Sequence, residues 1–221
     1  MNEPKCAECK PKSCVRGVID ESILPSFCPI KNSKDLLEEV KARYRAEDIK
    51  DFYLQAALIE KEAYDEKAAR EEGRTVPVRP RIREIAEFAK KIGAEKVGIA
   101  FCSGLVEEAA RASAILKKSG LEVISTICSC GAADKTDLGV PSDYKIRDPE
   151  KFEAGCNPIL QAELLNRAKT AFNIIIGLCV GHDMLFTKHS RAPVTTLIVK
   201  DRFTGHNPVI SLYTKYHRDI V

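Results

Sequence analysis

The nine cysteines are the residues of this sequence best able to do chemistry. Thiolates bind soft metal ions and iron–sulfur clusters, and free thiolates attack disulfides. The chain starts MNEPKCAECK, which has no hydrophobic signal region, so we predict a cytoplasmic protein whose thiols stay reduced. An odd number of cysteines also cannot pair completely into disulfides within one chain. Metal binding or redox chemistry is therefore the first expectation.

The first four cysteines follow one another closely, in the pattern C-x-x-C-x4-C-x13-C. Their segment has few apolar residues, so we expect a bound metal rather than a hydrophobic core to fold it. Four thiolates suit tetrahedral zinc or an iron–sulfur cluster, and the proline after the last cysteine, as in bacterial ferredoxins, favours the cluster. Free cysteines packed in a core are the plainer alternative, but such cysteines prefer apolar neighbours. We name these residues the N-terminal cysteine group: Cys6, Cys9, Cys14 and Cys28.

Three of the other five cysteines come directly after a short apolar run. Cys102 follows KVGIAF, Cys128 follows LEVISTI and Cys179 follows FNIIIGL. If these runs are parallel strands, the cysteines meet at the sheet edge where such folds bind ligands. Two more cysteines lie nearby in the sequence, one just beyond Cys128 and one just before a predicted helix start. We name all five the strand-end cysteine group: Cys102, Cys128, Cys130, Cys156 and Cys179.

The strand-end cysteine group is predicted to form a second metal site. Small residues follow several of these thiols, in CSG, CSCGAA and CVGHD, and let the backbone approach a bulky cluster. Backbone N–H groups at helix starts also stabilise thiolate charge. The plainer reading is that Cys102 and Cys179 are small core residues, but three strands that end in the same way are harder to explain by chance. Five thiols exceed the four that a cubane cluster needs, so one is left as a spare, a redox partner or an exchangeable ligand.

Polar side chains are dense after the third and fourth apolar runs. Candidate catalytic residues in this part of the chain are His182, Lys200, Arg202 and His206. Side chains of these types bind an anionic substrate or deliver protons, and His182 is also a potential nitrogen ligand.

Structural roles compete with these catalytic ones. Asp183 is a suitable N-cap for a helix over HDMLFTKHS, and Asn207 is a suitable N-cap for a helix that starts at Pro208. His206 is suited to a turn.

The elements that must position these residues alternate between strand and helix from residue 81 onward. Segments with a helical spacing of apolar residues alternate with four short apolar segments that have the pattern of strands. This alternation predicts an α/β fold with a doubly wound, mostly parallel sheet of about four strands. Pro158 fits the first turn of the third of the helices. The strands are predicted at 96–101, 121–127, 172–178 and 194–200.

The part before the sheet divides in two. Residues 1–31 are predicted to form a cysteine-rich metal-binding segment. Residues 32–78 are predicted to form a helical segment, with helical spacing over 33–72, followed by a linker that contains TVPVRPR. Residues 79–221 are predicted to form the α/β domain. The helices predicted before residue 73 have more apolar surface than packing against the sheet alone would bury. Dimerisation of the chain through these helices is therefore one interpretation.

Composition excludes other classes of protein. The 35 Lys and Arg residues against 32 Asp and Glu leave a net charge of only +3, too small to indicate a nucleic-acid partner. No apolar run reaches the roughly 18 residues that a membrane helix needs, so no membrane partner is expected either.

Several longer stretches resemble a known family. The residues GLCVGHDMLF, APVTTLIVKDR and GHNP, with the start CAECKPKSC, are similar to an uncharacterised family of predicted metal-binding proteins, domain of unknown function 1847. The resemblance covers nearly the whole chain. It implies metal binding by the cysteines named above, in prokaryotes many of which are anaerobes, and it identifies no substrate.

The sequence thus predicts a redox protein with two iron–sulfur clusters of the [4Fe–4S] type. The first cluster would exchange electrons with a ferredoxin-like protein, and the second would be held by four of the five strand-end cysteines. If only three of the five bind it, one iron is open to a small anionic substrate in a reductase or desulfurase-like reaction. Two alternatives remain open. One is a non-enzymatic zinc-binding or metal-storage module, and the other is a two-cluster electron carrier without a substrate.

Overall fold

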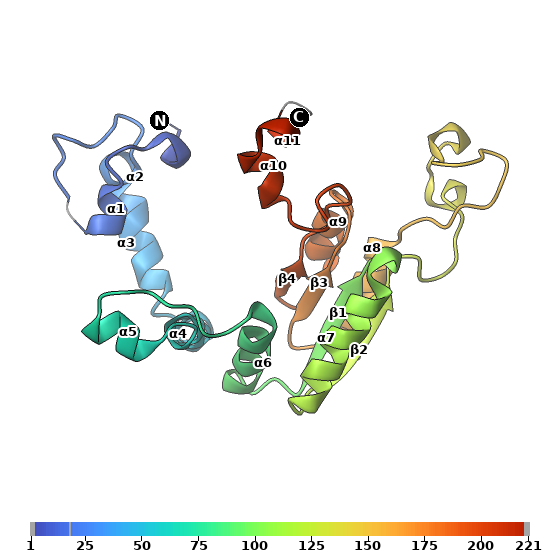
Figure 1. Ribbon diagram of the computed structural model, residues 1–221, viewed down its shortest axis with the longest axis horizontal. Coiled ribbons are helices and arrows are strands. Elements are labelled where there is room, and N and C mark those ends of the chain that lie inside the picture. Colours follow the sequence, from blue (N-terminus) through green and yellow to red (C-terminus); the bar gives the residue numbers. More distant parts are fainter. Residues whose placement is uncertain (1–2, 18, 219–221) are drawn as a thin grey trace. The chain divides into compact units, whose positions relative to one another are not determined.

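A four-stranded parallel sheet organises the C-terminal part of the chain (Figure 1). The strand order is β2-β1-β3-β4, and every neighbouring pair is parallel. This confirms the α/β class and the four-stranded parallel sheet predicted from the sequence. The strands are β1 (Lys96–Phe101), β2 (Glu122–Ile127), β3 (Asn173–Ile176) and β4 (Val194–Ile198).

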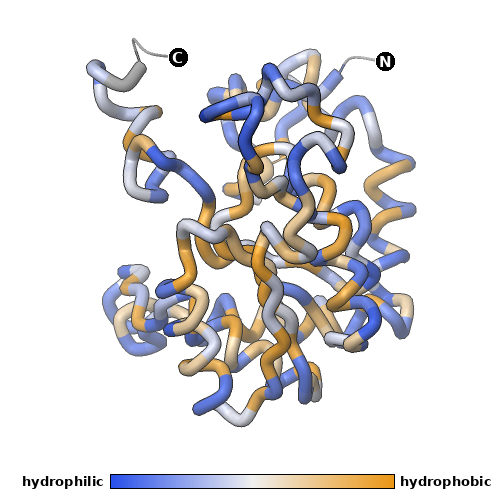
Figure 2. The backbone as a smooth tube through the Cα atoms, turned by 90° about the vertical axis from the view of Figure 1, so that its right-hand side faces the viewer, coloured by the Kyte–Doolittle hydropathy of each residue, from blue (hydrophilic) through white to orange (hydrophobic). Residues whose placement is uncertain are grey.

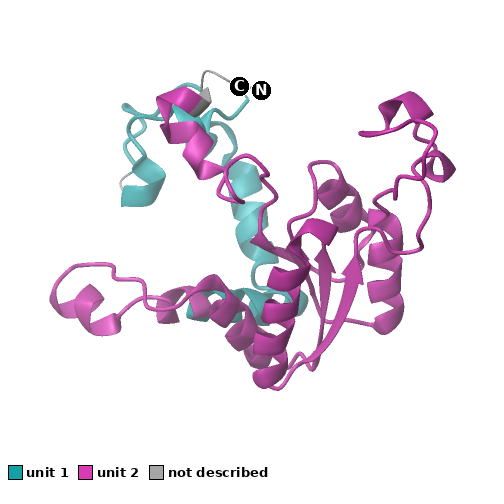
Figure 3. Cartoon of the chain, turned by 45° about the vertical axis from the view of Figure 1, so that its right-hand side comes forward, with its two compact units in different colours: residues 1–58 teal, residues 59–221 magenta. Residues whose placement is uncertain are grey.

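The computed structural model describes residues 3–17 and 19–218. The chain forms two compact units, Met1–Leu58 and Ile59–Val221 (Figure 3). The boundary falls inside the helix α4 (Glu47–Glu62) and so differs from the boundaries at 31 and 78 that the composition predicts. The three-part division of the sequence stays a prediction.

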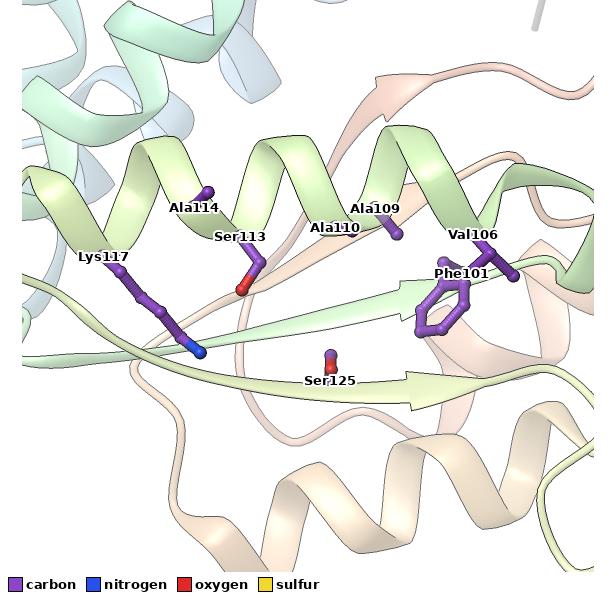
Figure 4. Close-up of a pocket in the computed structure, with 8 residues that line it drawn as sticks. All are labelled: Phe101, Val106, Ala109, Ala110, Ser113, Ala114, Lys117 and Ser125. Atoms are coloured by element: carbon purple, nitrogen blue, oxygen red, sulfur yellow. The ribbon is translucent and has the colours of Figure 1, made fainter.

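Helices cover both faces of the sheet. Helix α7 lies over β1 and β2, and α8 lies under the same strands on the opposite face (Figure 4). Helix α9 packs against α8. Pro158 begins α8, where its missing N–H costs nothing, and the side chain of Asn157 accepts a hydrogen bond from Leu160 N at 3.0 Å. The helices of this part are α6 (Arg81–Lys91), α7 (Val106–Lys118), α8 (Pro158–Ala168) and α9 (His182–His189).

The core lies between these layers. The two central strands are apolar and buried along almost their whole length, which is typical of a parallel sheet covered on both faces. Figure 2 colours the chain by hydropathy, with its hydrophobic stretches in orange. Helix α6 adds Ile85 and Ala89 to this core, and Phe88 meets Phe172 edge to face at 6.2 Å between ring centroids. The strand ends are therefore fixed by a rigid, packed interior.

A shallow groove runs between α7 and the outer strand β2 (Figure 4). Its volume is about 360 Å³, and small side chains such as Ala110 and Ser113 line much of it, with Lys117 at one end. It contains no cysteine and none of the candidate catalytic residues.

The helical spacing over 33–72 is broken in the structure into three helices. The chain turns after α3 and again after α4, where Asp65 caps the next helix by accepting a hydrogen bond from Ala68 N at 2.8 Å. The three helices are α3 (Lys34–Arg43), α4 (Glu47–Glu62) and α5 (Glu66–Glu71).

Short elements make up the rest of the described chain. The N-terminal cysteine group lies among η1 (Cys6–Glu8), α1 (Ser13–Arg16) and α2 (Pro29–Asn32), and η2 (Ser103–Leu105) follows β1. The β2–α8 loop, residues 128–157, contains η3 (Thr136–Leu138) and η4 (Ser142–Tyr144). The chain closes with α10 (Val209–Tyr213) and α11 (Lys215–Arg218).

Within residues 3–17 and 19–218, no helix combines the length and the apolar composition needed to cross a membrane.

Candidate thiolate site

The register of the sheet places two cysteines next to each other. Phe101 is opposite Ile127 in β2 and opposite Ile176 in β3, so Cys102 and Cys128 occupy equivalent positions one residue beyond their strands. The ladder continues through both, since Cys128 N donates to Phe101 O at 2.8 Å and Cys102 N donates to Ile176 O at 3.1 Å. Both side chains are buried, at 4% and 7% exposure for Cys128 and Cys102.

The β2–α8 loop returns Cys156 to the same place. Asp134 and Ala154 form an antiparallel bridge that closes the loop, and Asn157 N donates to Cys128 O at 2.7 Å. The Cys156 thiol then donates a hydrogen bond to the sulfur of Cys128. Two cysteines that are 28 positions apart in the sequence therefore form a hydrogen-bonded pair.

This pair is electrostatically asymmetric. The hydrogen bond from Cys156 lowers the pKa of Cys128 to about 5, against the opposing effect of burial, and the backbone N–H of Ser103, at 3.3 Å from the Cys128 sulfur, adds to the lowering. The pKa of Cys156 is raised, first by the same hydrogen bond and then by burial and by the nearby charges of Cys128, Cys179 and Cys102. Near neutral pH, Cys128 is the thiolate and Cys156 holds the proton.

Two cations face the other two thiols. Lys200 Nζ donates to Cys102 Sγ at 3.0 Å, and a guanidinium nitrogen of Arg202 donates to Cys179 Sγ at 2.9 Å. Gly104 N also approaches Cys102 Sγ, at 3.5 Å. We name this assembly the strand-end site: Cys102, Cys128, Cys156, Cys179, Lys200 and Arg202.

The fifth cysteine of the predicted group lies at the margin. Cys130 N donates to Ile127 O at 3.1 Å in the turn that follows β2, and its side chain is half-buried. Burial raises the pKa of Cys130, and the charge of Cys128 raises it further. Cys130 is thus a protonated neighbour of the strand-end site.

The side chains of the other two predicted catalytic residues form no hydrogen bond with a thiol in the described structure. His206 has a positive φ of 68°, and its Nδ1 accepts from Asp201 N at 3.1 Å, so its ring is turned back onto its own loop as a turn residue. His182 is the first residue of α9, and its Nδ1 is buried without a hydrogen-bond partner among the described residues.

The two predicted helix caps are wrong. Helix α9 starts at His182 with Gly181 as its cap, so Asp183 lies inside the first turn and its carboxylate accepts from Met184 N. Asn207 precedes α10, but Pro208 is the cap of that helix and no side chain caps it.

The N-terminal cysteine group is more open. Cys6 and Cys14 are exposed, Cys9 is half-buried and Cys28 is buried at the start of α2. Considering the described residues of the whole chain, the structure contains no group of three or more His, Cys, Asp and Glu side chains arranged to hold a single metal ion.

One residue that supports the strand-end site was not predicted. Gln161 of α8 is fully buried, and its Nε2 donates to Thr126 O at 2.7 Å and to Phe101 O at 3.4 Å, just before Cys128 and Cys102. Its Oε1 has no hydrogen-bond partner in the described structure. One feature of the sequence could have indicated this role: Gln161 is a polar residue among the buried residues of α8, which also include Ala162 and Leu165.

Comparison with known proteins identifies the family. The family model described as "Protein of unknown function (DUF1847)" matches residues 28–197, which is most of the chain. The chain belongs to this family. The matched region of the DUF1847 family includes the whole strand-end cysteine group and Cys28, whereas Cys6, Cys9, Cys14, Lys200, Arg202 and His206 lie outside it.

A relative extends beyond the family model. The chain is 40% identical over 213 residues to the uncharacterized protein MJ0455 of Methanocaldococcus jannaschii, and the match covers 96% of this chain and 95% of the relative. The match is therefore longer than the region 28–197 that the family model covers.

Proposed function

We propose that this protein is a redox protein that binds an iron–sulfur cluster through the cysteines of the strand-end site. The observation that carries the proposal is the convergence of four thiols from four separate segments, three of which accept hydrogen bonds from a cation, a backbone N–H or both. Hydrogen bonds to thiolate sulfur are a usual feature around iron–sulfur clusters and adjust their reduction potential.

The donor set fits such a group chemically. Soft thiolate ligands select iron–sulfur clusters, Zn or Cu(I) over hard cations, and ligands must be deprotonated to bind. Cys128 has a lowered pKa, so one ligand is available as a thiolate, and the sulfurs of Cys102 and Cys179 each accept a hydrogen bond from a basic side chain. Cys156 would lose its proton when a metal binds, since the hydrogen bond that retains it is then replaced.

The N-terminal cysteine group supports a second cluster by its spacing. Cys6 and Cys14 are exposed, which is the accessibility that electron exchange with a ferredoxin-like partner protein needs. At the strand-end site, the exposed guanidinium of Arg202 suits contact with a small anionic substrate of a reductase or desulfurase-like reaction.

A second function is favoured by one observation, the Cys156 to Cys128 hydrogen bond. Without metal, the Cys128 thiolate would attack a substrate disulfide, form a mixed disulfide with one half of the substrate and release the other half as a thiolate. Cys156 would then attack the Cys128 sulfur of the mixed disulfide and give its proton to the departing second thiolate. The product is a Cys128–Cys156 disulfide. This alternative is thiol–disulfide exchange, with a substrate disulfide as the oxidant.

Metal and sulfide content, measured on protein purified without oxygen, tests the proposal. Two cubane clusters predict about eight iron and eight labile sulfide per chain and a brown absorption that dithionite bleaches. Replacement of Cys179 by Ser should lower the iron content by up to half, whereas Ser113→Ala, in the groove beside α7, should leave it unchanged.

The other outcomes contradict the proposal in different ways. Zinc without sulfide would indicate the zinc-binding or storage alternative. A metal-free protein with nine titratable thiols, two of which oxidise reversibly, would indicate disulfide exchange by Cys128 and Cys156.

A further inference from the structure

Lys200 reaches its partner across a neighbouring strand. It lies two residues beyond β4, whereas Cys102 follows β1, and β3 lies between these strands. Because neighbouring strands are about 4.8 Å apart, the lysine side chain must extend over the end of β3 to bring Nζ within 3.0 Å of Cys102 Sγ. A side chain on the end of β3 would stand in its path.

The residue at the end of β3 is a glycine. Gly177 has a φ of +67°, and Gly177 N donates to Ile198 O at 2.8 Å, so the backbone stays bonded to the β4 side. A Cβ at this position would lie 3.6 Å from Lys200 Cδ and only 2.0 Å from Cδ1 of the buried Leu105. Any larger residue would therefore fill the space beside the lysine chain.

A second glycine stands at the other end of the lysine. A Cβ on Gly104 would lie 3.3 Å from Lys200 Nζ and 4.0 Å from Cys102 Sγ, so a side chain there would crowd the ammonium group against the sulfur. Gly104 also contributes its own N–H to the same sulfur, at 3.5 Å. Gly104 thus leaves space for the lysine side chain and donates a hydrogen bond to the Cys102 sulfur.

We propose that Gly104 and Gly177 form a passage that positions Lys200 as the fixed positive partner of Cys102. In this role Lys200 is a positioning residue that acts through a thiolate ligand. It differs from the sequence expectation, in which Lys200 meets a substrate, because the ammonium group is held by the protein's own sulfur. The effect on a bound cluster rests on the proposed function, since a positive charge beside a thiolate ligand raises the reduction potential. The passage itself does not depend on a metal.

Lysine labelling of the full-length, reduced and metal-free protein tests the passage. A limiting amount of an acetylating reagent should modify Lys200 more slowly than the exposed Lys188 of α9, as measured by peptide mass spectrometry. Cys102→Ala and Gly104→Val should each raise the rate at Lys200 by about fivefold, the change expected when one ordinary hydrogen bond is lost, and leave Lys188 unchanged. Equal labelling of the two lysines in the unmodified chain, or no response to either variant, would overturn the passage.

The reduction potential of the metal-loaded protein tests the charge effect. Lys200→Met, which keeps the length of the chain and removes the charge, should shift the midpoint potential of one redox centre to more negative values. Lys200→Arg should restore most of the shift, and Lys188→Met should have no effect. A potential that Lys200→Met leaves unchanged would overturn the electrostatic role.

The two tests separate this inference from the proposed function. A protein that contains no redox-active metal would contradict the proposed function, while the labelling rates would still decide whether the passage positions Lys200. Gly177→Ala is unsuited to either test, because its Cβ would clash with Leu105 and disturb the fold.

Discussion

At the scale of single residues, the strand-end site divides into two kinds of thiol. Cys102 and Cys179 are bonded to permanent or nearly permanent cations, whereas Cys128 and Cys156 are bonded to each other through one proton. A proton held between two thiols stabilises one thiolate at the expense of the other, and removal of either partner should change the titration of its neighbour.

The first prediction concerns the reactivity of Cys128 in reduced, metal-free protein. Because the pKa of Cys128 is lowered to about 5, its alkylation rate should rise around pH 5 and be nearly flat from about pH 6 upward, where the thiolate is fully formed. In Cys156→Ala the stabilising hydrogen bond is lost and burial remains, so the midpoint should move upward by several pH units. Rates at the Cys128 peptide, each normalised to its plateau, provide the measurement.

The control for this prediction is Cys130→Ala. Cys130 is near Cys128 but is not its hydrogen-bond donor, and its pKa is raised by burial. Its removal should leave the profile of Cys128 almost unchanged. A profile of Cys128 centred near pH 8 or 9 in the unmodified chain would show that the bond with Cys156 does not form in solution.

At the scale of elements, the β2–α8 loop decides whether Cys156 meets Cys128. The base of the loop is fastened by Asp134, whose carboxylate accepts from Thr136 N at 2.9 Å and from Glu153 N at 2.8 Å and lies 3.0 Å from the Lys145 ammonium. These hydrogen bonds, led by the one from Thr136, hold the pKa of Asp134 well below its usual range. The carboxylate is therefore ionised and bonded at any physiological pH.

Replacement of Asp134 by Asn should loosen this loop. The amide keeps one acceptor, but it loses the ion pair with Lys145 and presents an N–H₂ group to a backbone donor. Hydrogen exchange of the loop amides should become faster by about tenfold, and exchange in β1 and β3 should stay the same.

Asp148→Asn is the matched control, because it lies in the same loop but pairs with the largely exposed Lys151. If both variants exchange alike, the bonds of Asp134 do not fasten the loop.

The packing of β1 against β3 depends on Gly98. A Cβ there would lie 2.0 Å from Oδ1 of the fully buried Asn173 and 2.8 Å from Leu165 Cδ1. Asn173 cannot move easily, since it accepts from Thr170 Oγ1 and donates to Ser190 Oγ, both at 2.8 Å. Gly98→Ala should therefore lower the free energy of unfolding by about 3 kcal/mol, measured by urea denaturation.

A double-mutant cycle identifies the cause of this loss. In an Asn173→Ala background the main obstacle is gone, so the additional cost of Gly98→Ala should fall to about half, with Leu165 as the remaining contact. If the losses in the free energy of unfolding from the two substitutions simply add, the clash with Asn173 is not the cause, and the new methyl group is opposed by other parts of the strand packing.

The elements were predictable where apolar pattern alone determines them. Short apolar runs followed by Cys102, Cys128 and Cys179 indicate both the strands and the edge where their ends meet, because parallel strands all end on one side. The pairing of Lys200 with Cys102 was not predictable, since the sequence does not show that β3 lies between β4 and β1. The breaks in the helical spacing after Arg43 and Glu62 were also missed, because neither has a glycine or proline to mark it.

At the scale of the whole molecule, the two units differ in how they are stabilised. In the second unit, Glu62 at the end of α4 is bonded to Arg79 and Lys91, each at 2.8 Å, and Arg79 also pairs with Glu87 of α6. The last turn of α4 is thereby attached to the helix that enters the sheet domain. These partly buried contacts add to a continuous apolar core.

Within residues 3–17 and 19–32, the start of the chain has no such core. Leu24 and Cys28 are buried there, but Val15, Ile19 and Ile23 are 81%, 64% and 52% exposed. Burial of so little apolar surface does not balance the conformational entropy of about thirty ordered residues. A metal bound by the N-terminal cysteine group would supply the missing free energy, as it does in small metal-binding domains.

The last prediction follows from this difference. Removal of metal by a chelator under reducing conditions should raise hydrogen exchange over residues 6–32 towards the rates of an unfolded chain, while β1 and β3 remain protected by their own packing. The double variant Cys6→Ser and Cys9→Ser should reproduce this change without the chelator, because two of the four proposed ligands are lost. Ser22→Ala, which removes only an exposed hydrogen bond to Asp20, should not. Equal protection of residues 6–32 with and without metal would show that this segment folds by its own contacts, and the N-terminal metal site would then have no structural role.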